Sequence, residues 1–148
     1  MFRIHMTGAV GSIALATVAS AQAQFGSALE ARAMLERMVA AVKVDKAKAL
    51  DQMQKGEAGF KDRDLYAFCA NVSDGVLTAH PALKGTPLQS IKDKDGKAFG
   101  EEMMKVAIEG SINEVDYMWP RPGEAAPAQK VSFVTKTADQ VCGVGYYK

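Results

Sequence analysis

The stretch from Leu65 to His80 constrains the fold more than any other part of the sequence. It holds two apolar runs on either side of Asp74-Gly75, and an Asp-Gly pair in that setting is the strongest short-range signal for a β-hairpin. Apart from Asn71, the first run is apolar in both of its alternating sets, whose members are Leu65, Tyr66, Ala67, Phe68, Cys69, Ala70 and Val72. A strand of this kind is buried on both faces. We therefore expect a central hairpin with a helical layer on one face and, on the other, a second layer that carries the function.

The first 23 residues have the three-part layout of a secretory signal peptide. Arg3 and His5 make a weakly basic start, residues 9–19 form an apolar run, and residues 19–21 or 21–23 offer a cleavage site of small side chains. The apolar run is about half as long as a helix that spans a bilayer. We expect this leader to be removed and the protein to be periplasmic or secreted; the alternative is an uncleaved anchor.

Length and charge predict one domain without a basic surface. Arg3 is the only charged residue among the first 23, so 17 of the 18 Lys and Arg residues and all 17 acids fall in residues 24–148. Nucleic acid or an anionic membrane surface would call for a basic patch. We therefore expect neither as a partner, and we expect residues 24–148 to fold as a single domain.

Two cysteines, Cys69 and Cys142, lie in the exported part of the chain, where an oxidising compartment lets disulfides persist. A bridge between them would tie the last apolar run to the central hairpin. The alternative is two separate buried thiols. A zinc site is disfavoured, because only His80 remains beyond the leader to complete the ligand set.

The other elements follow from periodicity. From about Ser27 the apolar residues repeat at helical spacing until Gly56, and Asp45 is a cap candidate within that segment, which is therefore either one bent helix or two. A short helix is expected over residues 99–107. Three later segments alternate as strands do, namely residues 112–119, 130–136 and 140–147.

Together these elements predict an α+β fold of PAS-like shape. Its five-stranded antiparallel sheet would carry a long N-terminal helix on one face and a short helix plus loops on the other. The run from Lys92 to Lys97 has the acidic character of a calcium loop, but Met104 stands where the closing glutamate would be. We expect a solvated turn there.

Five short motifs occur in order along the chain: Asp74-Gly75 with His80-Pro81, Asp95-Gly96-Lys97-x-Phe99, Tyr117-x-Trp119-Pro-x-Pro-Gly123, Lys130-x-Ser132-Phe133 and Gly143-x-Gly145-x-Tyr147. Over residues 30–148 the chain thereby resembles a single Cache domain of type 2. The resemblance implies an extracytoplasmic ligand sensor of the kind found in chemoreceptors and histidine kinases. It also implies a small carboxylate ligand such as acetate, propionate, lactate or pyruvate.

The chain departs from the family pattern at two places. Cys69-Ala70-Asn71-Val72 stands where the family often has Trp-Ile-Asn-Asp, and Gln140 stands where the closing strand often begins with Trp. One acid and two aromatic residues of the usual pattern are therefore absent. For Asn71 we expect a structural role, with its side chain capping the turn at Ser73-Asp74.

A small anion in a partly dry cleft needs a positive charge, hydroxyl groups and an apolar wall. Lys130 is the candidate for the charge, Tyr117 and Ser132 for the hydroxyls, and Trp119 for the wall. His80 is either a donor in the pocket or a hydrogen-bonding residue at the corner after the strand. The structural alternatives are a solvated lysine on a strand and aromatic residues that belong to the core.

The sequence thus predicts an extracytoplasmic module that binds a small organic carboxylate and signals through a membrane receptor or kinase partner without itself spanning the membrane. The alternative is a structural or protein-interaction module of the same fold without a ligand. An enzyme is disfavoured, since beyond the leader His80 is the single histidine and no nucleophile–base pair, phosphate loop or metal-ligand cluster is evident. We expect no cofactor and no metal. A homodimer through the N-terminal helix stays open.

Overall fold

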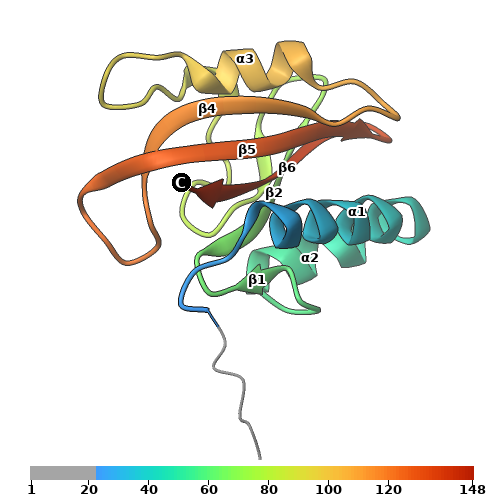
Figure 1. Ribbon diagram of the computed structural model, residues 1–148. Helices are drawn as coiled ribbons and strands as arrows, with labels where there is room; N and C mark the ends of the chain where they lie inside the picture. The colour runs from blue at the N-terminus through green and yellow to red at the C-terminus, as the bar shows by residue number, and fades with distance from the viewer. Residues whose placement is uncertain (1–22) are drawn as a thin grey trace, which may run out of the picture.

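The computed structural model describes residues 23–148, so the predicted leader lies outside the described residues except for Ala23. The elements in chain order are α1 (Ala28–Val44), α2 (Lys46–Lys55), β1 (Lys61–Asp62), β2 (Leu65–Asn71), β3 (Leu77–Ala79), the 3-10 helix η1 (Leu88–Ser90), α3 (Phe99–Val106), β4 (Asn113–Pro120), β5 (Pro127–Thr137) and β6 (Gln140–Tyr147). Helices α1 and α2 cover one face of the sheet, and α3 lies over the other (Figure 1). The predicted α+β fold is confirmed.

The N-terminal helical segment is two helices, which settles the question that the sequence left open. Ser27 and Glu30 form a capping box at the start of α1. Asp45 has an extended backbone, ends α1 and begins α2, where its side chain accepts a hydrogen bond from the backbone N–H of Lys48 at 3.1 Å. Gly56 ends α2 in the left-handed conformation. Within residues 23–148 no helix is long and apolar enough to cross a bilayer.

The sheet is antiparallel with the order β1-β2-β6-β5-β4, and β3 pairs with β2. The five predicted strands are all present, and the two-residue strand β1 adds a sixth because Lys61 and Asp62 fold back on β2. β2 lies between β1, β3 and β6, and six of its seven residues are buried. The hairpin predicted around Asp74-Gly75 is present, and β2 is covered on both faces. Its expected central place is wrong, because β3 pairs only with β2 and the hairpin therefore forms one edge of the sheet, with β6 in the middle.

Alternate residues of β2 belong to different cores. Leu65, Ala67 and Cys69 pack against α1 and α2. Tyr66 and Phe68 pack on the opposite face, against residues of η1, α3 and β4. The face that α3 covers also holds the polar side chains singled out in the sequence, so the second layer is where the candidate site lies.

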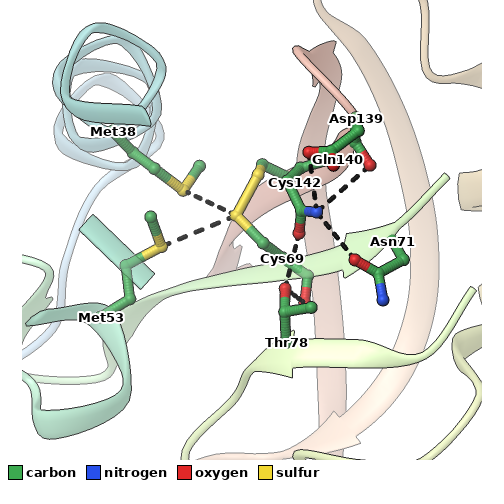
Figure 2. Close-up of a disulfide and its surroundings, with 8 residues drawn as sticks. All are labelled: Met38, Met53, Cys69, Asn71, Thr78, Asp139, Gln140 and Cys142. Carbon is green, nitrogen blue, oxygen red and sulfur yellow. Dashed lines mark hydrogen bonds between the residues drawn. A yellow bond between two sulfur atoms is a disulfide. The ribbon is translucent and has the colours of Figure 1, made fainter. Parts of the chain in front are cut away.

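Cys69 and Cys142 form a disulfide, as predicted, and they are direct partners in the register of β2 and β6 (Figure 2). The neighbouring pair in that register is Asn71 and Gln140. The side-chain amide of Gln140 donates to Asn71 Oδ1 at 2.9 Å, and Thr78 Oγ1 donates to Gln140 Oε1 at 2.6 Å. Gln140, the residue found in place of the family's aromatic, thus joins the ends of three strands.

The expected role of Asn71 as a side-chain cap is wrong. Its side chain faces Gln140 because the two residues are paired across the strands. The turn is held instead by the backbone carbonyl of Asn71, which accepts from the N–H of Gly75, and by Asp74 Oδ1, which accepts from the N–H of Val76 at 2.9 Å.

Candidate functional site

Strand register brings the predicted polar residues together. Lys130 on β5 is flanked by Tyr117 on β4 and by Tyr147 on β6. Ser132 follows two residues after Lys130 on β5 and lies opposite Gly145. The hydroxyl of Ser132 is 2.8 Å from the hydroxyl of Tyr117. Directly paired residues point to the same face of a sheet, so these side chains form one polar cluster under α3.

Lys130 is completely buried, with no exposed side-chain surface. Its Nζ donates a hydrogen bond to the hydroxyl of Tyr66 at 2.9 Å and lies 4.1 Å from the centre of the Tyr66 ring and 4.9 Å from that of Tyr147. In the described part of the chain no carboxylate lies within ion-pair distance of this amine. The alternative of a solvated strand lysine is therefore wrong.

Burial lowers the pKa of Lys130 to about 7, because the charged amine loses its hydration. The negative charge of Asp64 acts in the opposite direction. The Asp64 carboxylate is already engaged, since it accepts a hydrogen bond from the N–H of Gly26 at 2.7 Å and lies 3.5 Å from Nε of Arg121. Lys130 is thus a buried cation site whose charge is only partly compensated by the protein.

Two glycines of β6 make the space in which this cluster lies. A Cβ atom at Gly145 would be 2.3 Å from Cε of Lys130 and 2.5 Å from Oγ of Ser132. A Cβ atom at Gly143 would be 2.5 Å from the ring of Phe68. The Gly143-x-Gly145 motif therefore provides a recess in the middle of the sheet, and the lysine crosses it.

Replacing Gly145 with alanine is expected to destabilise the protein by about 1–3 kcal/mol and to displace the Lys130 side chain, because overpacking forces neighbours out of their rotamers. Urea denaturation measures the loss. The same substitution in a Lys130→Ala background is the control, since that chain lacks the Cε atom which the new methyl group meets. Part of the cost should remain in that background, because the new Cβ atom also meets Oγ of Ser132 at 2.5 Å. An equal cost in both backgrounds would contradict the clash with Lys130.

A small cavity of about 20 Å³ adjoins the cluster, enough for about one water molecule. Its lining is mainly apolar and comprises Tyr66, Phe68, Leu77, His80, Leu83, Leu88, Ile91, Phe99, Met103 and Trp119. Trp119 is thus the one residue of the four predicted around the anion that lines this cavity. Lys130, Tyr117 and Ser132 are not in the lining, and Tyr66 connects the two regions, since its ring lines the cavity and its hydroxyl bonds Lys130.

Tyr66 is the site residue that sequence reasoning missed, because in a strand apolar on both faces it was assigned to the core. Burial raises its pKa, so the phenol stays protonated at neutral pH. A tyrosine hydroxyl in a fully buried strand needs a polar partner, and that requirement was the available signal. Tyr117 is both a core aromatic residue and a member of the polar cluster. The centre of its ring is 4.1 Å from that of Phe99, on which it stacks, and its hydroxyl is hydrogen-bonded to Ser132.

His80 forms the corner after β3. Its Nδ1 accepts hydrogen bonds from the N–H groups of Ala82 and Leu83, both at 3.0 Å, so the ring proton is on Nε2. Burial and then the charge of Lys130 lower the pKa of His80 to about 4, which keeps the ring neutral at pH 7. The structural role is therefore present, and the same ring also lines the cavity and packs edge-on against Tyr66.

The loop over residues 81–98 covers the cavity with Leu83, Leu88 and Ile91, and Asp93 anchors this loop to the sheet. Residues 94–97 are exposed, as expected for a solvated turn, whereas Asp93 itself is 9% exposed. One oxygen of its carboxylate accepts from the N–H groups of Asp95 and Lys97, and the other accepts from the N–H of Met118 on β4. The first part of the loop is held separately by the β2–β3 hairpin, since the N–H of Leu77 donates to the carbonyl of Thr86 at 2.9 Å and the N–H of Leu88 donates to that of Gly75 at 2.8 Å. Asp93 therefore anchors the part of the cover that follows η1.

Replacing Asp93 with asparagine is expected to loosen the part of this cover that follows η1, because the amide presents a donor where the carboxylate accepts. Hydrogen bonds, first of all the one from Met118, hold the pKa of Asp93 below its ordinary value, so the anchor is present at neutral pH and is lost as the pH falls through that lowered pKa. Hydrogen exchange of the Lys97 and Met118 amides should become roughly tenfold faster. Unchanged exchange would show that the anchor is unimportant.

Comparison with known proteins gives the family. The profile of the type 2 Cache domain family (dCache_2) matches residues 28–147. The chain belongs to the Cache domain family. The described structure agrees with this assignment: it is similar to a methyl-accepting chemotaxis protein from Vibrio parahaemolyticus, with a TM-score of 0.63 and 25% sequence identity over 80% of this chain and 86% of that one.

Other relatives of this Cache domain are also sensor domains. The chemotaxis protein McpP of Pseudomonas putida KT2440 is 35% identical over 90 residues, which is 58% of this chain but 16% of that receptor. A periplasmic sensor domain of a chemotaxis protein has a TM-score of 0.59 at 25% identity over 78% of this chain and 86% of that one. A Cache chemosensory domain studied for its recognition of carboxylic acids shares the fold. Its TM-score is 0.58 at 24% sequence identity, over 78% of this chain and 84% of that one. At the level of the family, the chain is thus a sensor-type Cache domain, and the similar proteins are chemotaxis and chemosensory proteins.

Proposed function

We propose that this Cache domain reversibly binds a small organic carboxylate at Lys130 and reports its presence to a membrane receptor or kinase. The supporting observation is the buried amine, which has one hydrogen bond to protein and no carboxylate partner among the described residues. A buried ammonium without a counter-ion is costly, and an anion beside it removes much of that cost. A Cache chemosensory domain of the same fold recognises carboxylic acids, which is in keeping with this class of ligand.

The arrangement suggests how such a ligand would be held. Its carboxylate would lie between Lys130 and the hydroxyl of Tyr66, while its carbon chain would lie against Trp119 in the apolar cavity. A ligand of two to four carbons does not fit into about 20 Å³. Binding must therefore displace the cover over residues 81–98 or turn the Tyr66 ring, and this movement is a candidate for the signal.

Binding is expected to take up a proton, because only the charged form of Lys130 attracts a carboxylate. With the pKa of the free site at about 7, affinity should be constant below pH 7 and fall about tenfold for each pH unit above it. Calorimetry in two buffers of different ionisation enthalpy measures the uptake, which should approach one proton per ligand near pH 9. An affinity independent of pH between 6 and 9 would exclude Lys130 as the charge in the site.

The deciding experiment is a thermal-shift and calorimetric screen of the purified, disulfide-bonded protein against carboxylates of two to four carbons and matched amides. A ligand at 100 times its dissociation constant should stabilise the fold by about 2.7 kcal/mol. Lys130→Met should abolish the effect, whereas Lys136→Met, a half-buried lysine at the other end of the same strand, should preserve it. Binding that survives in Lys130→Met would overturn the proposed site.

A second candidate function is an interaction module that keeps the fold without a ligand. The small cavity and the missing acid and aromatic residues favour it. The two functions separate in the same screen. If no compound shifts the unfolding temperature while the protein is folded, the search turns to a protein partner.

A further inference from the structure

Four sulfur atoms meet on the face of the sheet opposite to Lys130 (Figure 2). Sδ of Met38 is 3.6 Å and Sδ of Met53 is 3.7 Å from Sγ of Cys69, which is bonded to Cys142. These residues come from α1, α2, β2 and β6, and none of them is more than 2% exposed. Because a disulfide carries no proton, the two methionine contacts are contacts between sulfur atoms and not hydrogen bonds.

The spacing of these sulfur atoms suits a metal centre. Metal–sulfur bonds of about 2.3 Å in a tetrahedron place the sulfur atoms about 3.8 Å from one another. The two methionine sulfurs already lie at nearly this distance from Cys69 Sγ. The Cys69–Cys142 bond holds these two donors closer together than a tetrahedral site requires, and breaking that bond would let them separate.

We propose that reduction of the Cys69–Cys142 disulfide converts this cluster into a Cu(I) site with two thiolate and two thioether ligands. A dithiol reductant would supply two electrons and two protons and leave as its own disulfide, giving two thiols. Cu(I) would then replace both thiol protons, which pass to solvent. The donor set selects the metal, because thioether and thiolate sulfur suit Cu(I), whereas zinc is bound by thiolate, imidazole and carboxylate.

Such a site would have a clear structural consequence. In the oxidised protein the bridge joins β2 to β6, and the reduced protein lacks this link. A bound Cu(I) would restore the link and extend it to α1 and α2, because each of the four donors lies on a different element. Since Lys130 points to the opposite face of the sheet, the copper site is independent of the proposed carboxylate site.

The test is a Cu(I) titration under nitrogen, against a chromogenic Cu(I) chelator, of the protein before and after reduction by a dithiol that is removed by desalting. The reduced protein should retain one Cu(I) per chain, with only sulfur ligands in its X-ray absorption spectrum and a raised unfolding temperature. The oxidised protein should retain none. Retention by the oxidised protein to the same extent, or loss of the native circular dichroism spectrum on reduction, would overturn the proposal.

Two variants separate the methionines from the cysteines. In Met38→Leu/Met53→Leu the sulfur ligands should fall from four to two and the affinity by roughly tenfold or more. Leucine is close in volume to methionine, so the fold should persist. Met34→Leu is the matched control, because Met34 is a buried methionine of the same helix α1 without a contact to the disulfide among those described. If the double variant binds Cu(I) as the wild type does, the methionines are not ligands and the proposed site is wrong.

Discussion

Replacing Lys130 with methionine is expected to raise the free energy of unfolding at pH 7 by about 3 kcal/mol, even though it removes the proposed ligand site. The folded state holds the pKa of this amine at about 7 instead of 10.5. This pKa difference lowers the stability of the wild type by about 4 kcal/mol at pH 7. The variant avoids that loss but gives up the hydrogen bond to Tyr66, which contributes about 1 kcal/mol. Methionine has a similar length and is uncharged, so it fills the recess without the desolvation cost.

The pH dependence of stability identifies the cause. Because the pKa of Lys130 is lower in the folded chain than in the unfolded chain, the unfolded state binds more protons between pH 7 and about 10.5. The wild type should therefore gain stability as the pH rises through this window, and below pH 7 this group should contribute no slope. The methionine variant should lack the gain, so the difference between the two proteins shrinks as the pH rises.

Urea denaturation between pH 6 and pH 10 measures both effects. Lys136→Met is again the control, and its effect should stay within about 0.5 kcal/mol at every pH, as for other substitutions near the surface. A Lys130→Met variant that is less stable than the wild type at pH 7, with the same pH slope, would show that the buried amine is fully compensated inside the protein. The proposal that it awaits an anionic ligand would then lose its physical basis.

Removing the disulfide is expected to have the second large effect. Replacing Cys69 and Cys142 with alanine should lower the free energy of unfolding by about 4 kcal/mol and the unfolding temperature by roughly 15 °C. The bridge joins residues 73 positions apart, and closing such a long loop removes much of the conformational freedom of the unfolded chain. The free energy of unfolding of a small domain is about 5–15 kcal/mol, so the variant should still fold at room temperature.

The measurement is urea denaturation of the double variant beside the wild type, with and without reductant. Reductant should weaken the wild type by a similar amount and leave the variant unchanged. A loss below about 1 kcal/mol would mean that the unfolded chain keeps the two strands together without the bridge. The same experiment shows whether the reduced protein keeps the fold that the proposed copper site requires.

Local patterns in the sequence were sufficient to predict the helices and strands of this fold. The apolar runs on either side of Asp74-Gly75 predicted the hairpin, and helical periodicity predicted the layer that covers it, whereas the place of the hairpin at the edge of the sheet depends on strand order. The cap at Asp45 marked the junction of α1 and α2, although periodicity could not decide between one bent helix and two. The order of five short motifs was sufficient to recognise the family, because each motif corresponds to a turn or strand end that this fold requires. The secretory leader stays a prediction.

Only the tertiary structure decided what the site is made of. Tyr66 and Lys130 are 64 residues apart, and they meet because β6, with glycines at positions 143 and 145, lies between β2 and β5. The same strand order places Asn71 beside Gln140 and the methionines of two helices against one disulfide. A residue's local sequence determines which way its side chain points from its own strand or helix. Its neighbours across the sheet, and thus its burial, charge and pKa, depend on strand order and register, which are set by long-range packing of the whole chain.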